Sequence, residues 1–388
     1  MERCLITPRP DWKEQAERLG FHFHTIDGET YWDESAYYRV KMSQVDDDLE
    51  PATLAVHDMA LELVNEVVDS EALLRRLSIP AEYWGWIRDS WKRRDPHLYG
   101  RMDFAYDGTG PAKLFELNYD TPTSLYEAGY FQWEWLDQQR AAGVLPEGVD
   151  QFNSIQERLL EALATLAREG LIHRDMHFSS VRESEEDRAT VRYLQDCAHQ
   201  VGINTAYVAI EDIGISREGW FTDTSDNVIR TLFKLYPLED MMLDRFGPEL
   251  VHNRMQLIEP AWKAVLSNKG ILPLLWERHE GHPNLLPAFF VEPDASTPTG
   301  MVRKPLHSRE GANIEIVTAD GEKIASHGPY ADGPAILQAY HPLSCFEGNY
   351  PLVGSWVVAD QPAGIGIRED ATLITQNTSR FLPHAIIL

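Results

Sequence analysis

The residues from 100 to 120 constrain the fold of this chain more than any other segment. They read GRMDFAYDGTGPAKLFELNYD, two arms of alternating apolar and polar residues around a turn that contains glycine and proline. Alternation with a period of two predicts β-strands, because successive side chains of a strand point to opposite faces of the sheet. Turn residues between two such runs predict an antiparallel hairpin. The chain should therefore contain an antiparallel sheet with one polar face.

The register of this hairpin decides which polar residues meet. A turn centred on residues 109–110 places Asp103 opposite Glu116 and Arg101 opposite Asn118, all on one face. A slip of one residue would move the two sets to opposite faces. Carboxylates directly opposite each other are destabilising unless a cation lies between them, and two carboxylates with an amide oxygen suit Mg²⁺. A solvated polar sheet face explains the same pattern equally well on this basis alone.

Composition limits the class of protein. The chain has 388 residues, 43% of them hydrophobic, which is more than one core usually holds. Its formal net charge of −26 repels nucleic acid and anionic membranes and attracts cations such as a metal ion or a polyamine. An ordinary acidic surface accounts for this charge as well. Three cysteines without CxxC spacing, and no secretory or membrane-spanning apolar run, predict a cytoplasmic protein.

Periodicity predicts a mixed α and β fold with a helical N-terminal part. Apolar residues at helical spacing predict helices at 51–77, 83–91, 123–142 and 153–169. Residues 171–210 predict a βαβ subdomain in which a first strand opens at 171–173 and a second strand covers 205–210, joined by a helix that Ser184 can cap. From about residue 287 the pattern predicts hairpin strands, with turns at Asp320-Gly321, Gly348-Asn349 and Gly364.

An ordered series of motifs resembles a known family. GRMDF (100–104), ELNYD (116–120) and EAG (127–129) are followed by LIEP (257–260), SNKGILP (267–273), KP (304–305), REGANI (309–314) and IRED (367–370). This series resembles the synthetase domain of glutathionylspermidine synthase, an ATP-grasp carbon–nitrogen ligase, over nearly the whole chain. It is most like the stand-alone, single-domain bacterial members, which lack the N-terminal Cys/His amidase domain of the bifunctional relatives.

The resemblance implies an α/β (α+β) ATP-grasp-type ligase fold with a permuted order, in which the metal ligands precede the lysines. It divides the chain into a mostly helical N-terminal region (1–98), a metal-binding hairpin with the βαβ substrate region (99–260), and an ATP-binding lid with C-terminal strands (261–388). It also implies the following roles: Mg²⁺ ligands Asp103, Glu116 and Asn118; charge-stabilising Arg101 and Arg368; and ATP-binding Lys269, Lys304, Arg309, Gly311, Asn313 and Gln338, with residues 308–313 as a loop over the phosphates.

The function implied is ATP-dependent joining of a carboxylate to an amine. A carboxylate is a poor acyl donor, and phosphorylation gives an acylphosphate that an amine can attack. Lysines and arginines around phosphates supply the charge that such a transfer needs.

The substrates are predicted from two further features. The family's threonine-rich segment, which is associated with the peptide substrate, is replaced at 233–240, where Leu235 and Asp240 stand for threonines. We therefore expect a peptide-like acid other than glutathione. The acid pair Glu211-Asp212 follows the second strand of the βαβ unit, where a loop would project into a crevice, and together with the net charge of −26 it predicts a cationic amine such as a polyamine. A non-catalytic ATP- or polyamine-binding protein and an amino acid or peptide ligase are the alternatives.

Overall fold

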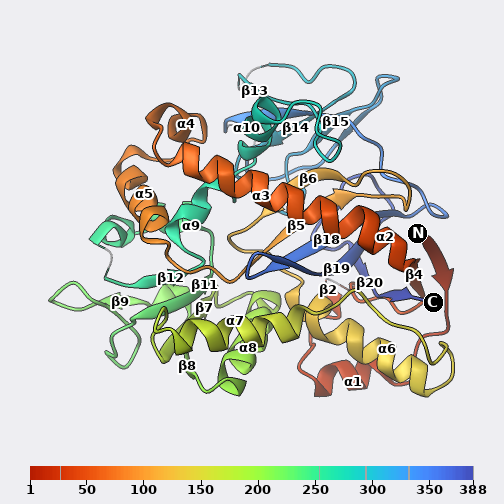
Figure 1. The fold of residues 1–388 in the computed structure, drawn as a ribbon, viewed down its shortest axis with the longest axis horizontal. Coiled ribbons are helices and arrows are strands. Elements are labelled where there is room, and N and C mark those ends of the chain that lie inside the picture. The colour runs from red at the N-terminus through yellow and green to blue at the C-terminus, as the bar shows by residue number, and fades with distance from the viewer. Residues whose placement is uncertain (27, 253, 293–294, 331–332, 388) are drawn as a thin grey trace.

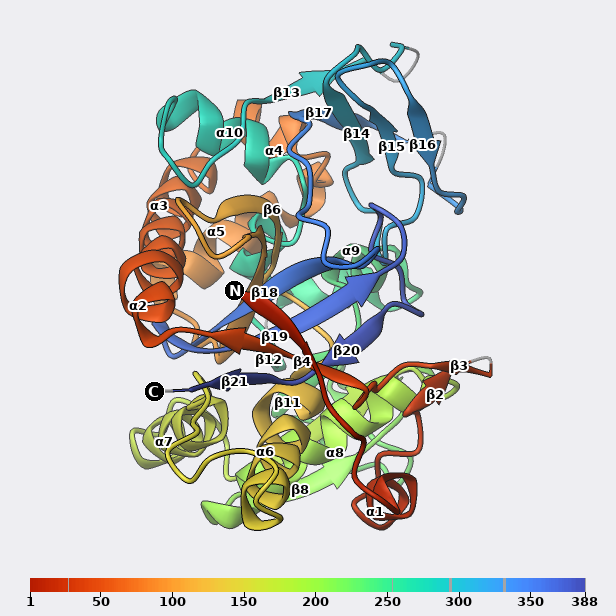
Figure 2. The same cartoon turned by 90° about the vertical axis from the view of Figure 1, so that its right-hand side faces the viewer.

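Three larger β-sheets organise the chain (Figures 1 and 2). The computed structural model describes residues 1–26, 28–252, 254–292, 295–330 and 333–387. In the view of Figure 2 one five-stranded sheet lies at the top, a second lies in the middle, and helices α6, α7 and α8 lie below. The middle sheet carries the hairpin that the sequence predicts, so it is described first.

The middle sheet is antiparallel and has the order β20-β19-β18-β5-β6. Its strands are β5 (Tyr99–Ala105), β6 (Lys113–Asn118), β18 (Tyr350–Val358), β19 (Gln361–Asp370) and β20 (Arg380–Leu382). Strands from the C-terminal part of the chain thus complete the sheet that the hairpin begins. Gly364 lies inside β19, so the turn predicted there is wrong.

The predicted hairpin register is confirmed on the polar face. Asp103 pairs with Glu116, and Arg101 pairs with Asn118. Beyond Asp103 the register shifts, so that Phe104 lies opposite Leu114. A bulge of this kind adds local twist to a strand and re-aims its side chains. The bulge therefore begins beyond Asp103 and leaves Arg101, Asp103, Glu116 and Asn118 on one face.

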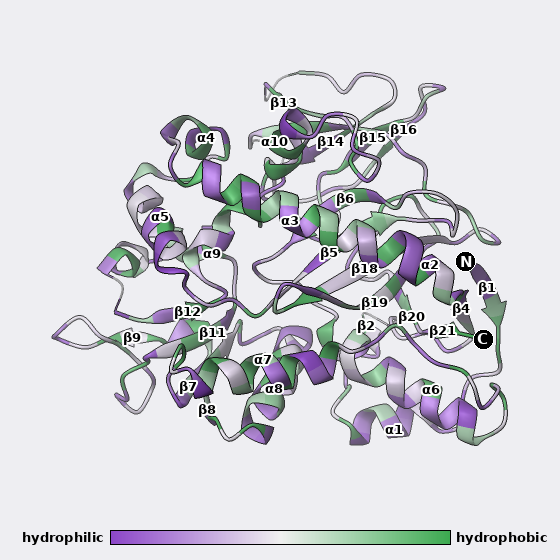
Figure 3. Cartoon of the chain, in the orientation of Figure 1, coloured by the Kyte–Doolittle hydropathy of each residue, from purple (hydrophilic) through white to green (hydrophobic). Residues whose placement is uncertain are grey.

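Helices of the N-terminal region cover this sheet. Figure 1 shows α3 (Glu50–Val67) crossing in front of the central strands, and Figure 3 shows hydrophobic and hydrophilic residues alternating along it. The single helix predicted at 51–77 is divided, because Ser70 accepts a hydrogen bond from the Leu73 amide (3.3 Å) and caps a separate helix α4 (Glu71–Arg76).

The lower sheet is parallel and contains the predicted βαβ unit. Strand β7 (Asp175–Ser180), helix α8 (Glu185–Gln200) and strand β8 (Asn204–Tyr207) are joined as expected, and the Ser184 side chain caps α8 through the Asp187 amide (3.2 Å). Strands β11 (Thr231–Leu235) and β12 (Gln256–Ile258) extend this sheet. The first strand begins later than predicted, at Asp175, because residues 171–174 form the bend between α7 and β7.

The upper sheet has the order β13-β17-β14-β15-β16 and is antiparallel. Its strands are β13 (Ala288–Val291), β14 (Met301–Pro305), β15 (Glu315–Val317), β16 (Lys323–Ala325) and β17 (Ala335–Ala339). The predicted turn at Asp320-Gly321 joins β15 to β16, as expected. The loop between β14 and β15 faces the middle sheet and becomes important below.

The remaining regular elements flank these sheets. They are β1 (Glu2–Leu5), α1 (Trp12–Arg18), β2 (Thr25–Ile26), β3 (Glu29–Thr30), β4 (Ala36–Val40), α2 (Met42–Gln44), η1 (Val45–Leu49), η2 (Ala81–Tyr83), α5 (Trp84–Arg93), η3 (Glu127–Phe131), α6 (Gln132–Ala141), α7 (Ile155–Arg168), η4 (Ile210–Asp212), β9 (Gly214–Ile215), β10 (Phe221–Thr222), α9 (Leu238–Leu243), η5 (Gly247–His252), η6 (Ala261–Val265), α10 (Ile271–Arg278) and β21 (His384–Ile386). Strands β1, β4 and β21 form a small sheet, in which the strands at the two ends of the chain lie on either side of β4.

A buried ion pair ties the hairpin to the lower sheet. Asp120, just after β6, pairs with Lys234 of β11, and both side chains are fully buried. Asp120 also accepts a hydrogen bond from the Leu238 amide (2.8 Å). Removal of one member of such a pair leaves an uncompensated buried charge, so this contact fixes the loop after the polar hairpin. Among the residues described, no helix has the length and apolar character to cross a membrane.

Candidate active site

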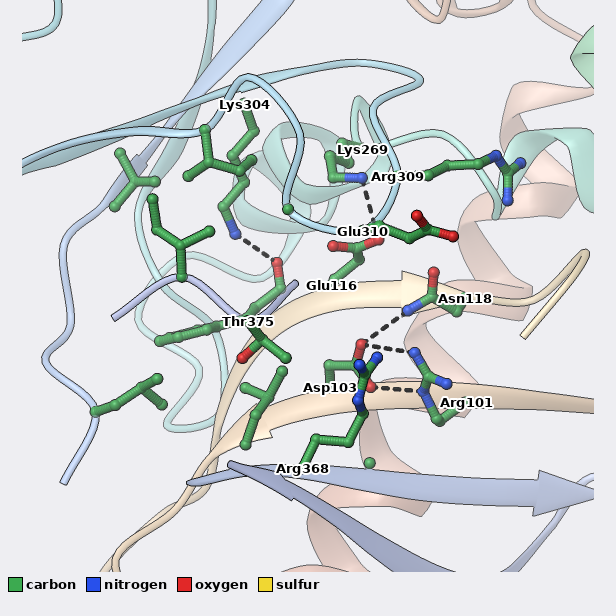
Figure 4. Close-up of a pocket in the computed structure, with 18 of the residues that line it drawn as sticks. Arg101, Asp103, Glu116, Asn118, Lys269, Lys304, Arg309, Glu310, Arg368 and Thr375 are labelled. Atoms are coloured by element: carbon green, nitrogen blue, oxygen red, sulfur yellow. Dashed lines mark hydrogen bonds and ion pairs between the residues drawn. The ribbon is translucent and has the colours of Figure 1, made fainter. Parts of the chain in front are cut away.

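One pocket, between the middle and upper sheets, collects nearly all the residues that the sequence predicts (Figure 4). The predicted residues that line it are Arg101, Asp103, Glu116, Asn118, Lys269, Lys304, Arg309, Gly311, Gln338 and Arg368. Asn313 does not line it. Its Oδ1 accepts a hydrogen bond from the Tyr330 amide (2.8 Å), and its positive φ of 54° belongs to the turn that closes the loop after β14.

The polar face of the hairpin forms one side of the pocket. Arg101 forks onto Asp103, with Nε 2.7 Å from Oδ1 and Nη2 3.1 Å from Oδ2. Asn118 donates its Nδ2 to Asp103 Oδ2 (2.9 Å), and Figure 4 shows the amide oxygen of Asn118 turned away from that contact. Burial would lower the pKa of Arg101, but Asp103 and Glu116 raise it above its ordinary value. Charge is therefore concentrated and partly balanced here without a ligand.

Two lysines face this hairpin from other elements. Lys269, just before α10, lies 3.0 Å from Glu116 Oε1 and also donates to the Ser308 carbonyl. Burial raises the pKa of Glu116, but the cations of Lys269 and Lys304 outweigh it and hold that pKa below its ordinary value. Glu116 therefore stays ionised, with Oε1 in contact with Lys269.

Lys304 of β14 is held between the hairpin and the upper sheet. Its Nζ donates to the Phe115 carbonyl (2.9 Å) and to Gln338 Oε1 (2.7 Å), and Gln338 donates in turn to the Leu114 carbonyl (3.0 Å). Burial lowers the pKa of Lys304 to about 8, against the charge of Glu116, which raises it. The ammonium has three donors, so one remains for a ligand oxygen.

The loop after β14 closes over the pocket. Arg309 reaches Thr121 Oγ1 (2.7 Å) and Glu239 Oε1 (2.6 Å), so it links the loop to the segment after the hairpin and to α9. Gly311 has a φ of 70°, and a Cβ there would lie 2.4 Å from the Thr375 carbonyl oxygen. Only glycine fits this approach without strain. The loop thus packs against the 374–379 segment and covers the pocket from one side.

Arg368 of β19 carries an unsatisfied donor. Its Nη2 donates to the carbonyls of Gln376 (2.6 Å), Asn377 (2.9 Å) and Ser379 (3.1 Å), which hold the side chain in place. Its Nε is buried and has no hydrogen-bond partner. A buried N–H of this kind costs free energy until an acceptor reaches it. The arrangement therefore suits an incoming oxygen that carries negative charge.

A second acidic group, which the sequence analysis missed, lies beside Arg368. It consists of Glu127, Glu186, Asp187 and Glu310. Glu127 is fully buried; its Oε1 accepts from the Tyr31 hydroxyl (2.5 Å), and its Oε2 has no partner. Burial first, and the charge of Glu127 second, raise the pKa of Glu186 to about 8. The group comes from three separate parts of the chain, so no local spacing reveals it.

The acid pair Glu211-Asp212 does not line this pocket. Asp212 pairs with the Arg182 guanidinium (2.5 Å), and Glu211 accepts from the Arg182 amide (3.2 Å). Glu211 lines a separate cavity instead. The crevice expected beside this pair therefore exists, but it is a different one from the pocket that holds the predicted site residues.

The donor set of the hairpin face fits Mg²⁺. Asp103 and Glu116 supply carboxylate oxygens, and Asn118 has an oxygen that Asp103 does not use. Hard oxygen donors from one or two carboxylates, completed by phosphate oxygens and water, are the usual environment of this ion. Among the residues described, no cluster of three or more His, Cys, Asp or Glu side chains is placed to hold a metal.

Comparison with known proteins places the chain in a family. The family model described as glutathionylspermidine synthase preATP-grasp matches residues 3–387, and the chain belongs to this family. It is 37% identical over 403 residues to the "Putative acid--amine ligase" of Haemophilus influenzae, with 100% of both chains covered. It is 30% identical over 352 residues to trypanothione synthetase of Crithidia fasciculata, a match that covers 84% of this chain and 53% of that one.

A solved structure supports the same fold. A glutathione synthetase-like effector of Globodera pallida matches with a TM-score of 0.56 at 11% identity, covering 99% of this chain and 100% of that one. The chain thus has the mixed α/β, ATP-grasp-type fold expected from its sequence, and like its relatives it is a ligase.

Proposed function

We propose that this ligase joins a peptide-like carboxylate to a cationic amine in the pocket between the middle and upper sheets, with hydrolysis of ATP to ADP and phosphate. The observation that carries the proposal is the convergence of the two hairpin carboxylates, two buried lysines and three arginines on one pocket from four separate parts of the chain. Cations gathered around a small set of acids are what phosphoryl transfer requires.

Named residues have distinct parts in the first step. Asp103, Glu116 and Asn118 would hold Mg²⁺, which would balance the negative charge of the phosphates, and ATP supplies the phosphoryl group that is transferred. Lys269 and Lys304 bind phosphate oxygens, and Gln338, held against Lys304, borders the nucleotide. The loop at 308–313 excludes water, with Arg309 fixed by Thr121 and Glu239. An oxygen of the substrate carboxylate attacks the γ-phosphorus, the bond to the bridging oxygen breaks, and ADP leaves.

In the second step the amine nitrogen attacks the acyl carbon, and the carbon–oxygen bond to phosphate breaks. Negative charge develops on the carbonyl oxygen, and the unpaired Nε of Arg368 is a donor available to it. Arg101, which is buried beside Asp103, adds positive charge to the same region. An amine that enters as a cation loses two protons overall: one is carried away by the departing phosphate and the other passes to solvent.

The acidic group beside Arg368 supports a cationic amine. Glu186 feels the charges of Glu127, Asp187 and Glu310, and Glu127 keeps a buried oxygen that has no partner. Acids so close together raise each other's pKa values, and a bound cation relieves that repulsion. An ammonium group therefore satisfies Glu127 and stabilises the ionised forms of its neighbours, whereas an anionic amine would meet repulsion.

The acid substrate is proposed to be other than glutathione. Asp240 of α9 stands where related synthetases carry a threonine, next to Glu239, which pairs with the lid residue Arg309. Burial first, and the charge of Glu239 second, raise the pKa of Asp240. Asp240 does not itself line the pocket, so a carboxylate in place of this hydroxyl would act on the acid substrate through Glu239 and Arg309. Leu235 is buried at the end of β11 and does not line the pocket.

The test is a screen of carboxylates crossed with amines, with ADP release as the readout. Release that requires both partners supports ligation. Release with no pair, while ATP and a polyamine still bind, would support the non-catalytic alternative. Selective use of amino acids as the amine would favour a peptide ligase. We place the reaction in the cytoplasm, which suits three unpaired cysteines and a requirement for ATP.

A further inference from the structure

A path of buried hydroxyl groups leads out of the active-site pocket. It starts at Ser124, which lines the pocket and is buried. Ser124 Oγ lies 3.0 Å from the Tyr31 hydroxyl, and that hydroxyl donates to Glu127 Oε1 (2.5 Å). Tyr31 and Glu127 are fully buried. Three side chains therefore form one hydrogen-bonded path from the pocket to a buried carboxylate.

The direction of these hydrogen bonds follows from the number of protons. A tyrosine hydroxyl has one proton, and Tyr31 donates it to Glu127. The bond between Ser124 and Tyr31 must then use the Ser124 proton, so Ser124 is the donor in that bond. With this proton in use, Ser124 Oγ can only accept from a group in the pocket. The path therefore takes up a proton at its pocket end and delivers one to Glu127.

The backbone holds both hydroxyls in place. Ser124 has a φ of 66°, a conformation that residues other than glycine rarely adopt and that is found most often at functional sites. The carbonyl of the preceding residue, Thr123, accepts a hydrogen bond from Arg101 Nη1 (2.7 Å). The Tyr31 carbonyl accepts from the Phe381 amide (2.6 Å). Both hydroxyls are thus at hydrogen-bond distance before a substrate binds, as proton transfer requires.

The surroundings of Glu127 make it the acceptor of the path. Burial raises the pKa of Glu127, whereas the Tyr31 hydroxyl and the charges of Arg368 and Arg101 lower it. Its Oε2 is buried, and no residue of the described chain donates to it. Burial also holds the pKa of Tyr31 well above its ordinary value, so this hydroxyl passes one proton on only as it receives another. A transferred proton therefore comes to rest on Glu127.

We propose that Ser124, Tyr31 and Glu127 relay a proton away from the amine as it attacks the acylphosphate. This inference rests on the proposed function, which supplies both reactants. The nitrogen bonds to the acyl carbon, the carbon–oxygen bond to phosphate breaks, and one proton on nitrogen moves to Ser124 Oγ. Ser124 gives its own proton to the Tyr31 oxygen, and Tyr31 gives its own to Glu127 Oε1. Glu127 becomes a neutral carboxylic acid and releases its proton to solvent after the product leaves.

Competition between two nucleophiles tests the relay. The acid and amine with the fastest ADP release in the screen above are mixed with ATP, Mg²⁺ and hydroxylamine, and the amide and the hydroxamate are measured by mass spectrometry. Hydroxylamine is uncharged at neutral pH and attacks acylphosphates without a base, so it does not need the relay. The ratio of amide to hydroxamate therefore reports the second step alone, independently of ATP binding, acylphosphate formation and the amount of folded enzyme.

Tyr31→Phe keeps the ring, whose centroid lies 5.7 Å from the Arg368 guanidinium, and removes only the hydroxyl. It should lower the amide-to-hydroxamate ratio by about 100-fold, because a general base contributes about 10²- to 10⁴-fold. Glu127→Gln should have the same effect, and the double variant should lose no more than either single one, because both changes interrupt one path. Tyr126→Phe is the matched control, because the Tyr126 hydroxyl donates to the Leu19 carbonyl (2.9 Å); its ratio should not change.

Two results would overturn the relay while leaving the proposed function in place. One is a ratio in Tyr31→Phe within about threefold of the wild-type ratio, far below the contribution of a general base. The other is a pair of losses that multiply in the double variant, which would show two separate effects on structure. Absence of hydroxamate from the wild-type enzyme would instead remove the acylphosphate of the proposed function, and the relay with it.

Discussion

Replacement of Lys304 by methionine tests the nucleotide site most sharply. Methionine keeps the length of the side chain and removes the charge. Lys304 already spends two donors on Phe115 and Gln338, at 2.9 and 2.7 Å, so one donor remains for a phosphate oxygen. A hydrogen bond to a charged group contributes about 1.5–3 kcal/mol net, which corresponds to a loss of about 10- to 150-fold in affinity for a non-hydrolysable ATP analogue.

The pH dependence of this affinity should identify the same residue. Burial lowers the pKa of Lys304 to about 8 in the free enzyme. The cationic form binds phosphate and predominates below that pH. Above it the lysine must take up a proton before it binds, so the dissociation constant should rise by up to about tenfold per pH unit. Binding above pH 8 should therefore consume a proton, in contrast to binding below pH 7.

Calorimetry with the analogue and Mg²⁺, in buffers of different ionisation enthalpy from pH 6.5 to 9.5, measures both quantities. Lys323→Met is the matched control, because Lys323 is exposed on β16 of the same sheet and does not line the pocket. Thermal unfolding of each variant separates lost affinity from lost stability. An inflection near pH 8 that persists unchanged in Lys304→Met would refute the assignment of this lysine to the phosphates.

Three further predictions follow from the same geometry. Asp103→Asn should lower kcat at least about 100-fold and raise the Mg²⁺ concentration needed for activity. Asp107→Asn, in the exposed turn, should do neither. Equal metal dependence of the two variants in steady-state assays would contradict the metal assignment. Trypsin should cleave the 308–313 loop more slowly with ATP and Mg²⁺ than without, because the loop closes on bound phosphates; unchanged cleavage rates would exclude a lid. The kcat/KM for the amine should rise as the pH increases toward 8, because the Glu186 carboxyl has a pKa of about 8 and ionises over this range. Glu186→Gln should lose this rise, and Glu185→Gln should keep it. A rise that both variants retain would show that Glu186 is not part of the amine site.

The polar face of the hairpin could be predicted from the sequence, because it depends on residues that are close together in the chain. The alternation on both arms and the turn between them determine which residues of the hairpin share a face, and Asp103 and Glu116 meet as expected. The cap at Ser184 likewise fixes the start of α8. The bulge after Asp103 could not be predicted, because it depends on how the upper sheet and β18 pack on the hairpin.

Long-range parts of the site lay beyond such reasoning. Glu127, Glu186 and Glu310 come together beside Arg368 only because a turn of irregular helix, the start of α8 and the loop after β14 meet there. Asn313 belongs to the predicted loop motif, but it does not reach the pocket. Its positive φ suits the turn that ends the loop, and its side chain accepts a hydrogen bond from the Tyr330 amide. The predicted helix at 51–77 is divided for a different reason. The apolar pattern is continuous there, but the Ser70 cap begins a new helix.

Transfer of oxygen-18 from the acid substrate tests the central claim most directly. The acid–amine pair with the fastest ADP release would be supplied with its carboxylate labelled in both oxygens, and the phosphate released would be analysed by mass spectrometry. Attack of the carboxylate on the γ-phosphorus followed by loss of phosphate predicts one labelled oxygen in each phosphate released. Unlabelled phosphate, or label found in AMP, would contradict ligation through an acylphosphate in this pocket.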